Sequence, residues 1–396
     1  MSDNTPVLRL KKNEERRLLA GHLWVYSNEV DTRITPLGDF APGSAVAVHT
    51  SRDQCIAMAT VNPHTLICAR VYSHRLQEQL DTDLLVRRLQ AARQWRDQCY
   101  QQPFYRLVHG EGDWLPGLVV DRFGEVLVVQ TNTLAMQLRI DSIVEALQHV
   151  FTPVGIYLRN TSSARQLEGL ELESRVVAGE VPDSVEIIEN QLKFEVPLKA
   201  GQKTGWFYDH RDNRQRLQSL CSGKRVLDAY CYLGAWGMNA LAGGASEVVA
   251  IDSSETALAS AGKNAALNGY GEKWQGVQGD VSEVLKSMAT EKFDVVILDP
   301  PAFIQRAKDK RNGQQKYLSV NTAAVGLLAE GGLLVSGSCS HHLSTEALQK
   351  TVLQAGKRRH RGVQVVGVGG QGMDHPVHAA IAETAYLKVV YGRVIQ

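Results

Sequence analysis

The segment Arg225-Val-Leu-Asp-Ala-Tyr-Cys-Tyr-Leu-Gly-Ala-Trp-Gly237 decides the fold of this chain. It opens with a short hydrophobic run that ends at Asp228, which is typical of a buried strand, and it continues through two glycines into a helical stretch. A strand, a glycine-containing loop and a helix in this order indicate one unit of a doubly wound parallel sheet. Ligands bind such a sheet at the carboxyl ends of its strands, where glycines such as Gly234 permit close backbone approach.

The same alternation of strand and helix continues to the end of the chain. It predicts a Rossmann-like domain over residues 191–396, built on a mostly parallel seven-stranded sheet. Residues 1–75 instead contain short strand-like runs separated by turns, which predicts a small β-rich module. Residues 76–190 mix helical and strand patterns, so we expect a central α+β domain between the other two.

Composition excludes several classes of protein. The chain has 396 residues, a hydrophobic content of 44% and a formal net charge of +1, which exclude general disorder and leave no bulk signature of a nucleic-acid binder. Its six cysteines form no CxxC pair, so we expect neither a disulfide framework nor a bound metal. No signal-peptide pattern or long apolar run is present. These features predict a cytoplasmic protein that does not enter a membrane.

Acidic residues close the strands of the predicted sheet. Asp228, Asp252 and Asp280 each follow a strand, where a carboxylate can accept hydrogen bonds from ribose hydroxyls. Helix capping is the alternative role for each of them. Asp299 ends the next strand and is followed by Pro300-Pro301, which fix the backbone where the sheet opens. Together they favour a nucleoside ligand.

Several motifs carry a family resemblance. Gln202-Lys-Thr-Gly-Trp-Phe-Tyr-Asp-His-Arg211, the loop 228–237, Asp299-Pro-Pro301 and Ser338-Cys-Ser340 occur in this order. The succession resembles the large-subunit ribosomal RNA cytosine-5 methyltransferase family, over essentially the whole chain. The resemblance implies a PUA-type RNA-binding module, a central domain and a catalytic domain that uses S-adenosylmethionine. It further implies a cofactor pocket with the following lining residues: Lys203, Thr204, Phe207, Asp228, Gly234, Asp252, Asp280 and Asp299.

Methylation of cytosine carbon 5 requires a nucleophile, because that carbon is poorly reactive until a thiolate adds to carbon 6. Cys339 follows the fifth strand and is the preferred candidate, while Cys231 on the glycine loop is the competing one. Asp299 is expected to hydrogen-bond the cytosine. The chain departs from related enzymes in having Ala302 and Phe303 after the prolines, with no second cysteine to assist product release.

Basic segments offer local contacts for RNA phosphates. The loop after Asp299-Pro-Pro301 carries Arg306, Lys308, Lys310 and Arg311, and a second run occupies residues 357–361. A solvated charged surface is the alternative for that second run. The predicted partner is large-subunit (23S) ribosomal RNA. The sequence is also compatible with a homodimer.

Two other functions remain compatible with the sequence. One is a methyltransferase of the same fold that acts on a guanine or adenine nitrogen, for which Asp299-Pro-Pro301 suffices. The other is a non-catalytic RNA-binding assembly factor.

Overall fold

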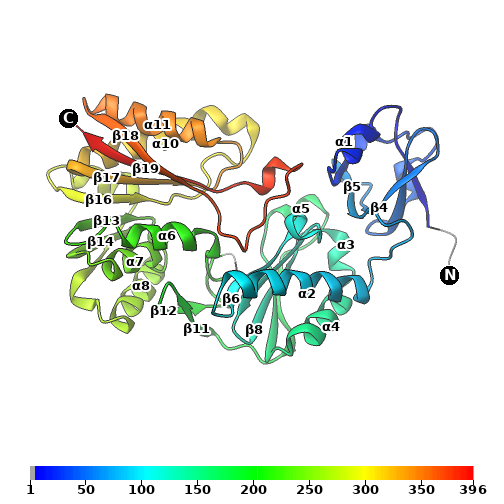
Figure 1. Cartoon of the computed structure of the whole chain (residues 1–396), viewed down its shortest axis with the longest axis horizontal. Coiled ribbons are helices and arrows are strands. Elements are labelled where there is room, and N and C mark those ends of the chain that lie inside the picture. The colour runs from blue at the N-terminus through cyan, green and yellow to red at the C-terminus, as the bar shows by residue number, and fades with distance from the viewer. Residues whose placement is uncertain (1–4, 203, 396) are drawn as a thin grey trace. The chain divides into compact units, whose positions relative to one another are not determined.

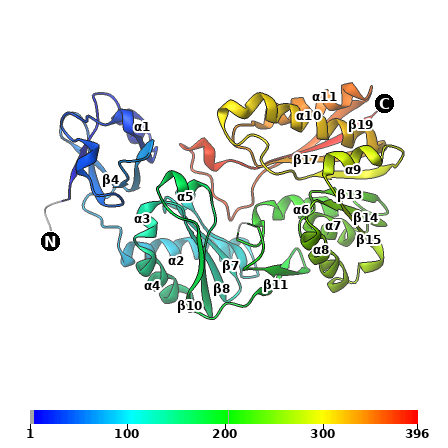
Figure 2. The same cartoon turned by 180° about the vertical axis from the view of Figure 1, so that it is seen from behind.

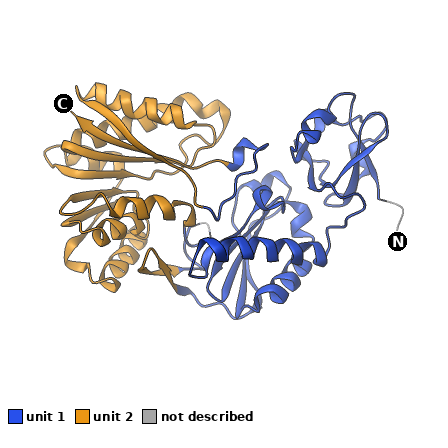
Figure 3. Cartoon of the chain, in the orientation of Figure 1, with its two compact units in different colours: residues 1–185, 197–206, 373–384 blue, residues 186–196, 207–372, 385–396 orange. Residues whose placement is uncertain are grey.

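The computed structural model describes residues 5–202 and 204–395, which form two compact units (Figure 3). The N-terminal unit comprises residues 1–185, 197–206 and 373–384. The C-terminal unit comprises residues 186–196, 207–372 and 385–396. The chain therefore returns to the N-terminal unit twice after first leaving it. Each unit is described by itself.

The N-terminal unit begins with a five-stranded sheet in the order β1-β3-β4-β5-β2. Its buried core is aliphatic and includes Leu8, Val48 and Val71, together with Ile381 from the returning segment. Short helical turns cover the ends of the strands. The elements are β1 (Val7–Arg9), α1 (Glu15–Leu19), β2 (Trp24–Tyr26), η1 (Ser27–Glu29), η2 (Leu37–Asp39), β3 (Ala45–His49), β4 (Cys55–Val61) and β5 (Ile67–Ser73).

A second five-stranded sheet of the same unit has the order β10-β9-β8-β7-β6. Helices α2 and α4 bury their apolar side chains against it in one common core (Figure 1). The elements are α2 (Thr82–Cys99), β6 (Phe104–His109), η3 (Gly110–Asp113), β7 (Leu118–Phe123), β8 (Val126–Thr131), α3 (Leu134–Gln137), α4 (Ile140–Phe151), β9 (Gly155–Asn160), α5 (Ala164–Leu167) and β10 (Glu173–Gly179).

The returning segment 373–384 is held by a buried polar network. The Asp374 carboxylate accepts the Arg106 backbone N–H at 2.9 Å, and the Asp374 carbonyl accepts an Arg96 N–H at 2.8 Å. Arg96 also forms a bidentate pair with Asp113 at 2.6 and 2.7 Å. These hydrogen bonds give the fully buried Asp374 polar partners and tie the returning segment to the sheet of β6 to β10.

The C-terminal unit is built on a seven-stranded sheet in the order β15-β14-β13-β16-β17-β19-β18. The first five strands in this order pair in parallel, and β19 and β18 pair antiparallel. The predicted mostly parallel, Rossmann-like sheet is therefore confirmed. Figure 2 shows β13, β14 and β15 side by side. The strands are β13 (Arg225–Ala229), β14 (Glu247–Asp252), β15 (Trp274–Gln278), β16 (Phe293–Leu298), β17 (Leu328–Ser338), β18 (Gly362–Gly369) and β19 (Lys388–Ile395).

Helices cover both faces of this sheet (Figure 1). Ser254, Asp280 and Ser344 begin three of them by accepting backbone N–H bonds, as helix N-caps do. The helices are α6 (Arg211–Gln218), α7 (Ala235–Ala242), α8 (Glu255–Leu267), α9 (Val281–Ser287), α10 (Lys310–Leu327) and α11 (Thr345–Arg358). The remaining elements are β11 (Ser184–Glu189) and β12 (Leu192–Pro197), which form a two-stranded sheet, and η4 (Tyr208–His210), η5 (Gly271–Lys273), η6 (Ala307–Asp309) and η7 (Ala382–Thr384).

Candidate active site

The loop between β13 and α7 forms one side of the site. The Gly237 N–H donates to Asp228 Oδ2 at 2.8 Å, which ties the helix to the strand end. A Cβ on Gly237 would lie 2.9 Å from Val248 Cγ1 and 3.1 Å from Asp228 Oδ2, so only glycine permits this approach. Tyr230 and Tyr232 adopt positive φ angles of 65° and 49°. Such strained conformations persist where surrounding structure enforces them, commonly at binding sites.

Asp228 is fully buried, and its carboxylate oxygen Oδ1 has no hydrogen-bond partner among the described residues. Burial raises the pKa of Asp228 to about 7, opposed by the Gly237 N–H and reinforced by the negative charges of Asp299 and Asp252. A buried carboxylate of this kind is suited to a ligand that brings a positive charge or a hydrogen-bond donor.

Asp252 ends the neighbouring strand β14. Its two oxygens accept the backbone N–H groups of Tyr232 at 3.0 Å and Ser254 at 2.9 Å. Each carboxylate oxygen has a further lone pair for a hydroxyl donor. Phe207 packs edge to face against the Tyr232 ring, with centroids 5.4 Å apart. The hydrogen-bond acceptor Asp252 and the aromatic rings of Phe207 and Tyr232 therefore lie beside the loop between β13 and α7.

Asp280 caps helix α9. Its Oδ1 accepts the backbone N–H groups of Ser282 at 2.9 Å and Glu283 at 3.2 Å, and the residue is exposed. The capping alternative considered from the sequence is therefore realised at this position. A role for Asp280 in ligand binding stays a prediction.

Asp299 follows β16 and is held by two residues that sequence reasoning missed. Trp236 Nε1 donates to Asp299 Oδ2 at 3.0 Å, and His210 Nε2 lies 3.1 Å from Oδ1. Burial alone would raise the pKa of Asp299, but the charge and hydrogen bond of His210 and the Trp236 N–H lower it below its usual value. Asp299 is consequently ionised at neutral pH and fixed in orientation.

Both missed residues stood inside motifs that the sequence already singled out. Trp236 belongs to the glycine loop, and His210 belongs to the Gln202–Arg211 motif. Their rings contact each other with centroids 5.2 Å apart. Each motif contains a side chain that can donate a hydrogen bond, and this was the signal that could have identified Trp236 and His210 as partners of Asp299.

The Asp-Pro-Pro loop is pinned against the end of β17. The Ile304 N–H donates to Ser340 Oγ at 3.2 Å, and the Phe303 ring packs on Tyr317 with centroids 4.8 Å apart. Tyr317 OH in turn shares hydrogen bonds with Ser338 Oγ at 2.8 Å and Ser340 Oγ at 3.0 Å. The two serines that flank Cys339 thereby hold its backbone.

Cys339 lies at the same sheet edge as Asp299. Leu298 and Ser336 are paired in the parallel register of β16 and β17, and a Cβ on Gly337 would lie 3.3 Å from Asp299 Oδ1. Cys339 follows two residues later and is partly exposed. The two residues that the sequence predicted to be catalytic therefore follow neighbouring strands at one edge of the sheet.

A buried lysine lies next to this cysteine. Lys388 Nζ donates to the carbonyls of Ser340 and Tyr386, each at 2.8 Å. Burial lowers the pKa of Lys388 to about 8, whereas the charge of Cys339 acts to raise it. A cation at this position favours the thiolate form of a neighbouring cysteine.

The competing cysteine is poorly suited to nucleophilic attack. Cys231 is 4% exposed. Burial and the nearby charges of Asp228 and Asp252 raise the pKa of its thiol well above the usual value. Cys231 is therefore a protonated, enclosed thiol at neutral pH.

The remaining predicted ligands of the cofactor differ in their placement. Thr204 belongs to the N-terminal unit, is fully buried, and donates its hydroxyl to the Asp121 carboxylate at 2.5 Å. Asp121 also receives a bidentate pair from Arg106 at 2.6 and 2.9 Å. Lys203 lies outside the described residues.

The two basic runs differ in the exposure of their side chains and in the groups that these side chains contact. Arg306, Lys308, Lys310 and Arg311 are exposed at η6 and the start of α10, and Arg306 pairs with Asp309 at 2.9 Å. In the second run, Arg359 donates to the Thr322 carbonyl and Arg361 donates to three carbonyls between residues 325 and 329. These two arginines satisfy backbone groups near the end of α10, which is a structural role.

Comparison with known proteins identifies the class of this site. Residues 158–356 match the family described as S-adenosylmethionine-dependent methyltransferase, and residues 8–74 match the PUA-like domain family. "Ribosomal RNA large subunit methyltransferase I" of Erwinia tasmaniensis is 37% identical over 395 residues, covering 98% of this chain and 99% of that protein. The chain belongs to the S-adenosylmethionine-dependent methyltransferase family.

Other similar proteins agree with this assignment. The methyltransferase is 35% identical to the Yersinia pestis protein of the same name, over 98% of this chain and 99% of that one. A solved structure assigned as a methyltransferase complexed with SAH has the same fold, with a TM-score of 0.85 and 21% identity over 98% of this chain and 100% of that chain. These matches confirm the predicted PUA-type module, the Rossmann-like fold and S-adenosylmethionine as the cofactor of this enzyme.

Within residues 5–202 and 204–395, no group of three or more His, Cys, Asp and Glu side chains is placed to hold a metal ion. In the same residues, no helix combines the length and the apolar character needed to span a bilayer.

Proposed function

We propose that this methyltransferase forms 5-methylcytosine in large-subunit (23S) ribosomal RNA through a covalent bond between Cys339 and cytosine carbon 6. The observation that supports the proposal is the register of β16 and β17, because the partly exposed Cys339 and the ionised, oriented Asp299 both follow strands that end at the same edge of the sheet. The names of the relatives, which cover nearly the whole chain, support ribosomal RNA as the substrate.

The cofactor fits the residues of the glycine loop. When bound, S-adenosylmethionine supplies an activated methyl group on a sulfonium. We infer that Asp228 Oδ1, which is buried without a partner among the described residues, receives the ammonium group of the cofactor, which S-adenosylhomocysteine also carries. Asp252 is suited to the ribose hydroxyls and Phe207 to the adenine face. Gly234, Asp280 and Thr204 remain proposed contacts.

Cofactor affinity is expected to fall at acid pH. The pKa of Asp228 is about 7 without ligand, and a bound cation would lower it. Ionised Asp228 therefore predominates above pH 7, and affinity should weaken by up to about tenfold per pH unit below that value. Calorimetric titration with S-adenosylhomocysteine from pH 5.5 to 8.5 checks this. Asp228→Asn should flatten the profile, and an equally steep profile in that variant would contradict the assignment.

The chain's own residues then account for the chemistry at cytosine. The Cys339 thiolate adds to carbon 6, the electron pair of the 5,6 double bond shifts to the bond between carbons 4 and 5, and the pair of the carbon 4–nitrogen 3 double bond moves to nitrogen 3. Carbon 5 of this enamine-like ring is then nucleophilic enough to accept the methyl group. Asp299 accepts a hydrogen bond from the exocyclic amine and holds the ring. Loss of the carbon 5 proton and cleavage of the carbon–sulfur bond restore the thiolate.

Lys388 is proposed to support the thiolate during this cycle. Its ammonium is buried, and the charge of Cys339 acts to raise the pKa of Lys388. Ala302 and Phe303 stand directly after Pro301, where related enzymes have a second cysteine that assists product release. Release must therefore use water or another neighbouring side chain.

Substrate RNA is proposed to contact the segment that leads from the Asp-Pro-Pro loop into α10. Arg306, Lys308, Lys310 and Arg311 are exposed there and directly follow the residues around Asp299 in the chain. Clustered cations bind phosphates without reading sequence, so they would position RNA rather than select the nucleotide.

RNA that contains 5-fluorocytidine tests the proposal. Fluorine at carbon 5 cannot leave as a proton does, so the Cys339 adduct should persist and migrate as a protein–RNA complex in a denaturing gel. Mass-spectrometric mapping of ribosomal RNA from cells with and without the protein should locate the methylated cytosine. Methylation of a guanine or adenine nitrogen without an adduct would overturn the cytosine mechanism, and an unchanged map would overturn the ribosomal target.

A further inference from the structure

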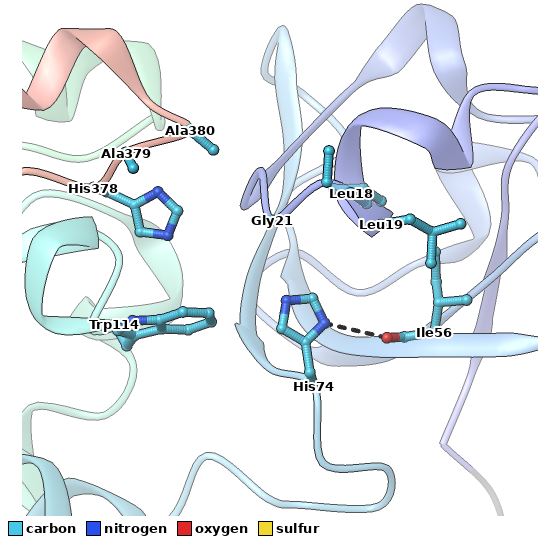
Figure 4. Close-up of a pocket in the computed structure, with 10 residues that line it drawn as sticks. Leu18, Leu19, Gly21, Ile56, His74, Trp114, His378, Ala379 and Ala380 are labelled. Carbon is cyan, nitrogen blue, oxygen red and sulfur yellow. Dashed lines mark hydrogen bonds between the residues drawn. The ribbon is translucent and has the colours of Figure 1, made fainter.

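A second candidate site lies in the N-terminal unit. An open cleft of about 600 Å³ is lined on one side by Leu18, Leu19 and Ile56 of the β-rich module (Figure 4). Trp114 at the end of η3 and His378 of the returning segment line the other side, and His74 extends from the end of β5. All of these residues belong to one compact unit.

Three aromatic rings gather in this cleft. The Trp114 indole contacts His74 with centroids 5.7 Å apart and His378 with centroids 5.4 Å apart, both edge to face. Trp114 nevertheless remains 36% exposed. Its backbone is left-handed, with φ of 60°, and its carbonyl accepts a hydrogen bond from Arg88. A left-handed backbone conformation is energetically unfavourable for a bulky residue, so the surrounding structure must enforce it at Trp114. In this conformation the indole ring lines the cleft.

Polar atoms for a planar ligand are also present. The Ile56 carbonyl accepts a hydrogen bond from His74 Nδ1 at 3.3 Å, which fixes the orientation of the His74 ring. His378 Nδ1 is buried and has no hydrogen-bond partner among the described residues. The cleft thus combines aromatic faces and apolar walls with one buried polar atom that requires a partner.

Charged residues of both signs lie near the cleft in the chain. Arg16 and Arg17 precede Leu18 and Leu19 on α1, where Arg17 pairs with Glu29 at 2.5 Å, and Arg75 directly follows His74. Glu111 is the acidic side chain whose charge acts on His378. Its carboxylate already accepts Trp24 Nε1 at 2.8 Å and Arg70 at 3.2 Å, so little free negative charge remains.

We propose that this cleft binds an unpaired nucleobase of the RNA substrate, stacked on Trp114 and bordered by His74 and His378. The proposal rests on RNA being the substrate, as inferred above. Bases stack on aromatic side chains without regard to sequence, and the partly exposed Trp114 indole between two imidazoles offers such a surface. The cleft would therefore hold single-stranded RNA outside the methylation site.

Fluorescence anisotropy with the full-length protein and fluorescein-labelled octaadenylate tests this site. Trp114→Ala should bind the probe roughly 10- to 100-fold more weakly, the range expected for losing one stacked base. Trp114→Phe, which retains a ring, should recover most of the affinity. An abasic ribose-phosphate probe should bind wild type and Trp114→Ala equally.

The control is Leu167→Ala, because Leu167 is 78% exposed in the same unit and does not line the cleft. It should bind octaadenylate as wild type does. Equal affinity of wild type and Trp114→Ala, with both retaining S-adenosylhomocysteine binding, would overturn the nucleobase site and point to another occupant such as a protein. The 5-fluorocytidine adduct is read separately, so failure of the cytosine mechanism and failure of this site give different results.

Discussion

Cys339→Ala should lower methyl transfer to RNA by roughly 10⁴-fold or more, because no other partly exposed thiol of the C-terminal unit is found among the described residues to replace the nucleophile. The substitution removes a partly exposed side chain whose backbone is held by Ser338 and Ser340, so the fold should persist. Incorporation of a tritiated methyl group measures the activity. Calorimetry with S-adenosylhomocysteine should give an affinity within about twofold of wild type.

Two further cysteine variants test whether the loss of activity is specific to Cys339. Cys231→Ala should still form the 5-fluorocytidine adduct, because the Cys231 thiol is enclosed and its pKa is raised. Cys55→Ala removes a half-buried thiol from the N-terminal unit and should leave activity unchanged. Adduct formation by Cys339→Ala but not by Cys231→Ala would reverse the assignment of the nucleophile.

The sheet and its acidic edge were predictable because both depend on local patterns. Short β-branched runs alternate with helices, and the carboxyl ends of parallel strands necessarily share one edge, so Asp252 and Asp299 could be placed from spacing alone. The antiparallel pairing of β18 and β19 at the far side completes the sheet of seven. The predicted domain limits at residues 75 and 190 remain predictions.

Contacts between distant segments could not be read from the sequence. His210 is 89 residues from Asp299 and binds it only because η4 and β16 are neighbours in the folded unit. The same holds for Lys388, which reaches Ser340 across the antiparallel pair of β17 and β19. Sequence spacing also does not distinguish a ligand-binding carboxylate from a helix cap. Asp280 stands where a ribose-binding carboxylate is expected, and in the structure it caps α9.

Asp299→Asn is the second substitution with a large expected effect. The carboxylate is ionised and receives donors from both Trp236 and His210, which together lower its pKa. An amide removes the negative charge and offers an N–H to one of two existing donors, so one of those hydrogen bonds must break. Turnover should fall roughly 10²- to 10⁴-fold, the range for losing a positioned group that acts in the reaction.

Single-turnover methylation at saturating RNA and cofactor separates this effect from binding. Asp299→Asn should reduce the rate constant much more than it changes the affinity for S-adenosylhomocysteine. Trp236→Phe provides the graded control, because it keeps a ring beside His210 but removes the Nε1 donor to Asp299. That variant should lose roughly tenfold, as expected for one hydrogen bond to a charged group. Equal rates for Asp299→Asn and wild type would mean that the ionised carboxylate does not contact the reacting base, and the geometry at this strand end would then serve cofactor binding alone.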